Sequence, residues 1–80
     1  MNIKIYTTKY CGFCHRAKQI LESKNLTFDE IPLDDNPTLR KQISEANEGY
    51  STVPMIFIDD KFIGGFTELA SEAQRGKLNK

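Results

Sequence analysis

The sequence predicts an α/β fold whose strands and helices follow one another in the order β-α-β-α-β-β-α. Strand-like and helix-like patterns alternate through the first fifty residues. Residues 55–58 are then apolar throughout, as in a strand buried on both faces. Asp59-Asp60-Lys61 follows as a turn into Phe62 and Ile63, which predicts a hairpin. The first two strands and their crossover helix form a right-handed parallel unit, and the hairpin adds antiparallel pairing, so we expect a mixed sheet.

The first half of the chain contains two strands with a helix between them. Residues 3–6 form the first strand, which ends at Thr7-Thr8-Lys9. Apolar residues then recur at helical spacing, at Phe13, Ala17, Ile20 and Leu21. We expect this helix to span residues 12–24, with Asn25 in the left-handed conformation as its stop. The second strand is expected within residues 26–33.

Two more helices are expected, each marked by residues typical of helix ends. Asn36 caps the second helix, and Pro37 takes its first position, where a missing N–H costs nothing. Asn47-Glu48-Gly49 closes it. For the last helix, after Gly64-Gly65, we expect Thr67 as the N-cap and Gly76 as the end.

Length, composition and charge exclude several classes of protein. Eighty residues form one small domain, residues 1–80, and 39% hydrophobic with 28% charged residues is ordinary globular composition. Eleven basic residues balance eleven acidic ones, so we expect no nucleic-acid partner. The longest apolar run, residues 53–58, is too short to cross a membrane, and the alternating N-terminus is unlike a signal peptide. We therefore expect a cytoplasmic protein with no membrane partner.

Cys11 and Cys14 are the only cysteines, and in the reducing cytoplasm they need a chemical explanation. Two intervening residues let both sulfurs meet across one helical turn, so an intramolecular Cys11–Cys14 disulfide is easily formed. Cys11 falls where the first strand passes into the helix, and the unpaired N–H groups of the first turn favour its thiolate. Cys14 lies deeper along the helix. These positions predict a nucleophile at Cys11 and a resolving thiol at Cys14.

Three other roles for the cysteines fit the sequence less well. They could be a buried pair of small apolar residues, but their place at a helix start makes this a poor explanation. A zinc site needs four ligands, and only Cys11, Cys14 and His15 are at hand. The same five residues, Cys11 to His15, match the attachment sequence of c-type haem, which requires export and an axial partner. We expect no metal here and an ordinary second-turn role for His15.

Several short segments together resemble the glutaredoxin family along essentially the whole chain. They are Lys9-Tyr10-Cys11, Cys14-His15-Arg16-Ala17, Thr52-Val53-Pro54 and Gly64-Gly65-Phe66-Thr67-Glu68-Leu69. The resemblance implies the thioredoxin fold, a four-stranded mixed sheet flanked by three helices. It also implies a glutathione-dependent thiol-disulfide oxidoreductase that reduces protein disulfides and glutathione mixed disulfides, with glutathione as co-substrate. The implied partners are therefore glutathione and disulfide-containing or glutathionylated proteins, and the protein is expected to be a monomer.

The same resemblance implies a glutathione-binding site. The expected residues are Lys9, Tyr10, Phe13, Thr52, Val53, Pro54, Gly65, Phe66 and Thr67. Pro54 is expected to be cis, and the backbone of Val53 to pair with the cysteinyl part of glutathione. Lys9 would meet the glycyl carboxylate, and residues 65–67 the γ-glutamyl end. Whether Arg40, Lys41 or Gln42 also helps is left open by the sequence.

Two alternatives arise from a departure within the motif. Dithiol glutaredoxins usually carry Pro and Tyr between the cysteines, whereas Gly12 and Phe13 stand here. Cys11-Gly12-Phe13 also resembles the start of the monothiol site, so one alternative is a dimer in which Cys11 and glutathione hold a [2Fe–2S] cluster. Cys14 replaces the serine expected there, which favours the dithiol class. The other alternative is a redoxin that is reduced by thioredoxin reductase.

Overall fold

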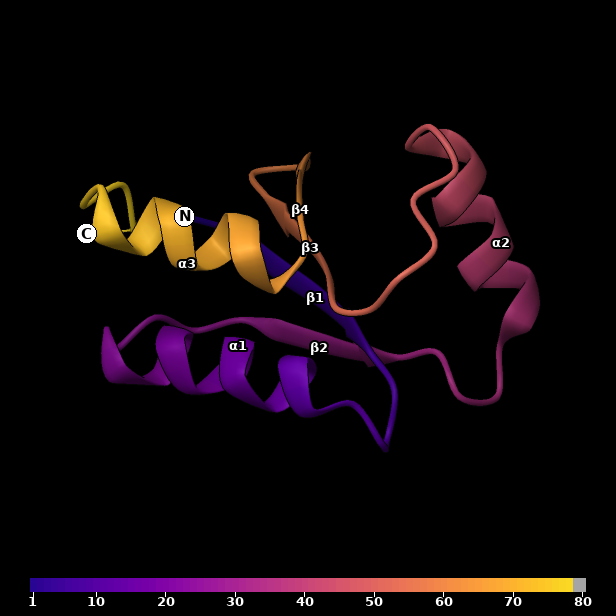
Figure 1. The fold of residues 1–80 in the computed structure, drawn as a ribbon, viewed down its shortest axis with the longest axis horizontal. Coiled ribbons are helices and arrows are strands. Elements are labelled where there is room, and N and C mark those ends of the chain that lie inside the picture. Colours follow the sequence, from indigo (N-terminus) through magenta and orange to yellow (C-terminus); the bar gives the residue numbers. More distant parts are fainter. Residues whose placement is uncertain (79–80) are drawn as a thin grey trace.

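The computed structural model describes residues 1–78 of the chain, and the seven elements come in the predicted order (Figure 1). They are β1 (Ile3–Thr7), α1 (Gly12–Ser23), β2 (Asp29–Pro32), α2 (Pro37–Ala46), β3 (Met55–Ile58), β4 (Lys61–Gly64) and α3 (Phe66–Gln74). No helix within the described residues is both long enough and apolar enough to cross a membrane.

The four strands form one mixed sheet in the order β2-β1-β3-β4. β1 pairs parallel with β2 and antiparallel with β3, where Ile5 lies opposite Ile56. β3 and β4 pair antiparallel across a turn in which Asp59 and Asp60 both have positive φ, 50° and 67°. Two successive residues of this kind match the twist of a hairpin, and aspartate tolerates the conformation. The mixed sheet is therefore confirmed, although its last strand begins at Lys61 and not at Phe62.

Each face of the sheet has its own apolar core. On one face, β1 residues Ile3 and Ile5 pack with residues of α1 and α3, and the buried members are Ile3, Ile5, Ala17, Leu21, Leu26, Ile56, Leu69 and Leu78. The other core is smaller and joins α2 to the sheet through Leu33, Ile43 and Met55, with several aromatic rings around them. Figure 1 shows α1 and α3 near each other and α2 apart from both. The alternation of side chains along β1 produces this division.

The ends of the helices follow local chemistry. Asn36 Oδ1 accepts the Leu39 N–H at 3.1 Å, so the predicted cap of α2 is confirmed. Asn25, with φ of 57°, and Gly76, with φ of 73°, both adopt the left-handed conformation beyond α1 and α3. These are residues that enter this conformation at little cost.

Thr67 is not the N-cap of α3, and that prediction was wrong. The helix begins at Phe66 with Gly65 as its N-cap, and the Glu68 carboxylate reaches back to accept the Gly65 N–H at 2.7 Å. This hydrogen bond from a backbone N–H to a side chain three residues further on fixes the N-cap two residues before the predicted one. Thr67 is consequently an exposed residue of the first turn.

Two strand predictions also need correction. β2 spans four residues, and Leu26 and Leu33 lie outside it as core residues of opposite faces. β3 is fully buried only at Met55 and Ile56, because its second half approaches the exposed turn of the hairpin.

Removal of the α2 cap should lower the stability of the protein. We expect Asn36→Ala to reduce the free energy of unfolding by about 1 kcal/mol, because the Leu39 N–H loses its acceptor. Urea denaturation followed by circular dichroism measures this change. Asn36→Ser, which keeps a capping oxygen, should lose much less, and equal losses in both variants would contradict a capping role.

Candidate active site: two unequal thiols beside a groove

Cys11 is the N-cap residue of α1 and holds its sulfur over the first helical turn. Its backbone is extended, with φ of −120° and ψ of 104°, and its Sγ accepts the Cys14 N–H at 3.0 Å. The sulfur thus occupies the place that a serine or aspartate oxygen takes in ordinary caps. A backbone donor and the positive end of the helix both favour negative charge at this atom.

Cys14 lies in a different environment although it is only three residues away. It is 2% exposed, whereas Cys11 is half-buried. Burial, followed by a hydrogen bond to Cys11, raises the pKa of Cys14 to about 12, although a backbone hydrogen bond from Thr8 and the charge of Lys18 act in the opposite direction. Cys14 therefore stays a protonated thiol at neutral pH. Both residues are free cysteines, so the Cys11–Cys14 disulfide stays a prediction.

A groove of about 330 Å³ opens beside the Cys11 sulfur. Its walls come from the start of α1, the loop before β3 and the start of α3, through Phe13, Tyr50, Thr52, Val53, Pro54, Gly65, Phe66, Thr67 and Glu68. Cys11 Sγ lies 3.7 Å from the Val53 carbonyl oxygen, so the sulfur borders one wall. The Val53–Pro54 peptide bond is cis, as predicted. A larger hollow, of about 610 Å³, lies between the end of α2 and β4, and no residue of α1, α3 or the Val53–Pro54 pair lines it.

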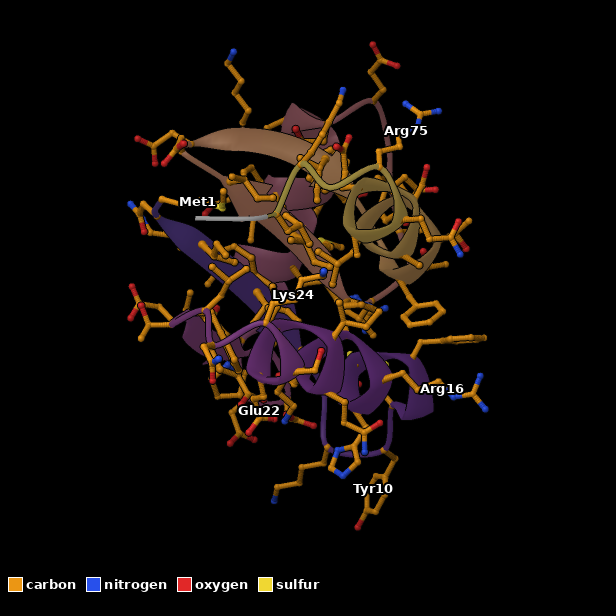
Figure 2. The ribbon with its side chains drawn as sticks, turned by 90° about the vertical axis from the view of Figure 1, so that its left-hand side faces the viewer. Met1, Tyr10, Arg16, Glu22, Lys24 and Arg75 are labelled. Carbon is orange, nitrogen blue, oxygen red and sulfur yellow. The ribbon has the colours of Figure 1, made fainter. Side chains whose placement is uncertain are left out.

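Two phenylalanines of the groove wall contact each other, and an arginine lies beside them. The rings of Phe13 and Phe66 lie 5.5 Å apart between centroids, and the Arg16 guanidinium lies 5.8 Å from the centroid of Phe13. This contact between α1 and α3 leaves Phe13 56% exposed. Figure 2 shows Arg16 extending outward from α1 into solvent. The groove therefore combines an apolar rim with a nearby positive charge.

Gly65 is needed where two walls of the groove approach each other. A Cβ atom at this position would collide with the Tyr50 hydroxyl and would lie 3.2 Å from the Pro54 carbonyl oxygen. Only a residue without a side chain lets the start of α3 come this close to the loop before β3.

Comparisons with known proteins agree with this arrangement. The family model described as glutaredoxin matches residues 3–63. The chain belongs to the glutaredoxin family. It is 44% identical to glutaredoxin 3 of Escherichia coli strain K12 over 78 residues, which cover 98% of this chain and 93% of that protein. Glutaredoxin of Pseudomonas aeruginosa is 40% identical over 77 residues, covering 96% of this chain and 90% of the relative.

Solved glutaredoxins share the fold closely. Glutaredoxin 1 from Francisella tularensis, in complex with cacodylate, has a TM-score of 0.79 and 45% identity, with 95% of each chain covered. A buckwheat glutaredoxin–glutathione complex has a TM-score of 0.89 and 28% identity, covering 95% of this chain and 71% of that one. The thioredoxin fold is thus confirmed. As a glutaredoxin, the protein is a thiol-disulfide oxidoreductase, and glutaredoxins generally use glutathione as reductant.

The structure brings most of the residues expected to bind glutathione together in this glutaredoxin's groove. Seven of them line it, namely Phe13, Thr52, Val53, Pro54, Gly65, Phe66 and Thr67. Lys9 and Tyr10 do not line it. Lys9 is exposed and its backbone N–H donates to Asp34 Oδ1 at 2.9 Å, while Tyr10 is 99% exposed and projects away from the ribbon in Figure 2. Both stand in the loop that leads to Cys11, with their side chains turned toward solvent.

Two groove residues, Tyr50 and Glu68, were missed by sequence reasoning. Glu68 had a recognisable pattern, because an acid three residues after a helix start is typical of a capping box. No local sequence pattern marks Tyr50, because its neighbour in the groove, Gly65, is far along the chain. Of the three α2 residues left open by the sequence, Arg40 contacts the loop before β3, where its Nη2 donates to the Ser51 carbonyl at 2.9 Å. Lys41 instead pairs with Glu45 at 3.9 Å.

The unequal thiols should differ in alkylation. In the reduced, folded protein we expect iodoacetamide to modify Cys11 alone at pH 8, because burial and the raised pKa of Cys14 keep its thiol protonated and out of reach. Peptide mass spectrometry after a timed quench identifies the modified sulfur.

The same reaction in urea is the control, since unfolding exposes Cys14 and both cysteines should then react. Equal labelling of the two residues in the folded protein would contradict the unequal environments described above.

Proposed function

We propose that this glutaredoxin reduces protein disulfides and glutathione mixed disulfides with glutathione as its electron donor, through Cys11 and Cys14. The observation that carries the proposal is the position of the Cys11 sulfur, half-exposed at a helix start and 3.7 Å from the Val53 carbonyl at the groove wall. When one half of a substrate disulfide lies in the groove, its sulfur atoms can reach the Cys11 sulfur.

The reaction proceeds by two exchanges. The Cys11 thiolate attacks one sulfur of the substrate disulfide, a Cys11–substrate disulfide forms, and the other sulfur leaves as a thiolate. Cys14 or free glutathione then attacks that mixed disulfide and releases the reduced product. When Cys14 attacks, it gives up its proton and the Cys11–Cys14 disulfide remains. Two molecules of glutathione then reduce this disulfide and leave as glutathione disulfide.

Three parts of the site suit three parts of glutathione. The backbone of Val53, next to the sulfur, offers the pairing partner for the cysteinyl unit. The N-terminal end of α3 favours an anion, which fits the γ-glutamyl carboxylate at Gly65, Phe66 and Thr67. For the glycyl carboxylate we propose Lys9, whose side chain is exposed in the loop that leads to Cys11. The buckwheat relative, solved with glutathione, supports this choice of ligand.

The two alternatives make different predictions for the same protein. A cluster-bearing dimer would become coloured and larger after anaerobic reconstitution with iron, sulfide and glutathione. Within residues 1–78 there is no group of three or more His, Cys, Asp or Glu residues that could hold a metal, so this chain would supply Cys11 alone. A thioredoxin-reductase-dependent redoxin would turn over with that enzyme and without glutathione.

The proposed roles predict a clear difference between two cysteine variants. With a glutathionylated peptide as substrate and glutathione reductase as the coupling enzyme, Cys11→Ser should lower turnover at least a hundredfold, because the nucleophile is gone. Cys14→Ser should keep a substantial part of it, because free glutathione can resolve the mixed disulfide. Equal loss in both variants would contradict this division of roles.

The groove can be tested at Gly65. We expect Gly65→Ala to raise the KM for glutathione about tenfold, because the new Cβ collides with the Tyr50 hydroxyl and shifts the wall of the groove. The reaction of Cys11 with a small aromatic disulfide should change less than twofold. In Gly65→Ala/Tyr50→Phe, which lacks the colliding oxygen, much of the affinity should return. An unchanged KM in Gly65→Ala would exclude glutathione from this groove.

A further inference from the structure

A cluster of three side chains, Thr7, Glu30 and Lys18, joins β1, β2 and α1, and its Glu30 side chain is 38% exposed. The Thr7 hydroxyl donates to Glu30 Oε2 at 2.7 Å, and Lys18 Nζ lies 3.2 and 3.1 Å from the two Glu30 oxygens. Thr7 is only 2% exposed, and the Lys18 side chain is 23% exposed. The Thr7 hydroxyl, together with Lys18, holds the pKa of Glu30 below its usual value against the effect of burial. Lys18 is therefore anchored to a carboxylate that stays ionised.

Lys18 stands one helical turn beyond Cys14 on the same face of α1, and its charge acts on that thiol. Thr8, next to Thr7 in the chain, supplies the backbone hydrogen bond to Cys14. The cluster thus holds Lys18 on the Cys14 face of α1, and the Thr8 backbone supplies a separate donor to the Cys14 sulfur.

The second exchange requires this buried thiol to ionise. In the resting protein, burial and two effects of Cys11 raise the pKa of Cys14. Once Cys11 is bound to substrate in a mixed disulfide, its sulfur carries no charge and its two effects disappear. Burial then still raises the pKa of Cys14, while the Thr8 N–H and the Lys18 cation lower it. Lys18 is the one side chain among these groups that favours the thiolate.

We propose that Lys18, held in place by Glu30 and Thr7, is a positioning residue for the resolving step, in which its cation stabilises the attacking Cys14 thiolate. The inference rests on the proposed roles of Cys11 and Cys14 and goes beyond them. Cys14 loses its proton to solvent, its thiolate attacks the Cys11 sulfur, the Cys11–Cys14 bond forms, and the substrate leaves with the electron pair of the broken bond. The first exchange, made by the more exposed Cys11 sulfur, does not depend on this cation to the same degree.

Few other ionisable groups bear on this step. Cys11 and Lys18, both on α1, act on Cys14, while the contribution of β1 is the Thr8 backbone. Lys18 and His15, also on α1, act on Glu30 of β2.

The two exchanges can be followed separately with 2,2′-dithiodipyridine in a stopped-flow instrument. Attack by Cys11 releases one thiopyridone at a rate proportional to the reagent concentration. Attack by Cys14 on the resulting mixed disulfide releases a second one at a rate independent of that concentration. Cys14→Ser should show the first phase alone. If it shows both, the proposed cysteine roles fail, whatever Lys18 does.

We expect Lys18→Met to slow the second phase about three- to tenfold at pH 7.5 and to move its pH profile upward by about half a unit to one unit. An effect of this size corresponds to an interaction between Lys18 and the Cys14 thiolate that is stronger than between two charges in water and weaker than between two adjacent charges near a protein surface. The first phase should change less than twofold and serves as an internal control for folding, together with thermal unfolding of each variant. Lys18→Arg, which keeps the charge, should stay within twofold of the unsubstituted protein.

Two further variants separate the cation from other effects. Lys41→Met breaks the exposed Lys41–Glu45 pair of α2 and should leave both phases unchanged. Lys18→Met/Glu30→Gln removes both charges, so that no unpaired carboxylate remains. Its second phase should remain at least twofold slower than that of the unsubstituted protein. Full recovery in this double variant, a second phase unaffected by Lys18→Met, or equal slowing of both phases would each overturn the proposal.

Discussion

The hydrogen bond from the Cys14 N–H to the Cys11 sulfur is the contact on which the rest of the site depends. It requires Cys11 to be extended and Cys14 to be helical, so it forms at the point where the loop after β1 ends and α1 begins. The same turn of helix presents one sulfur at the surface and turns the other into the core. The geometry of this one turn therefore places the Cys11 sulfur near the surface and the protonated Cys14 thiol in the core.

The packing of the apolar core determines the shape of the groove as well as the fold. Ala17 and Leu21 of α1 pack with Leu69 of α3 on one face of the sheet, which brings the first turns of the two helices together. Phe13 and Phe66 meet at that point and form the rim. A change deep in this core would therefore alter the width of the groove through the angle between the helices. Binding and stability are linked here because the same two helices provide both.

Local chemistry explains which features could be predicted from the sequence. Asn25, Asn36 and Gly76 act within a few residues of themselves, so their effects on helix ends can be recognised in the chain. The start of α3 was missed because Gly65 and Thr67 compete as caps, and the Glu68 side chain decides between them. Tyr50 in the groove and the Lys18–Glu30 pair join residues distant in sequence. Contacts of this kind depend on strand order and register, which no short pattern contains.

The burial that distinguishes the two thiols also creates a difficulty for the second exchange. A thiol removed from water is protected from outside reagents and stays protonated, yet the resolving step needs its anion. Full exposure of Cys14 would remove that difficulty and also the distinction between the two sulfurs. An anchored cation one turn away is a compromise, because it acts on the thiolate without admitting solvent. On this argument the first exchange is governed by the helix end and the groove, and the second by the burial of Cys14 and the Lys18 cation. The two steps can therefore be tuned by different residues of the same small domain.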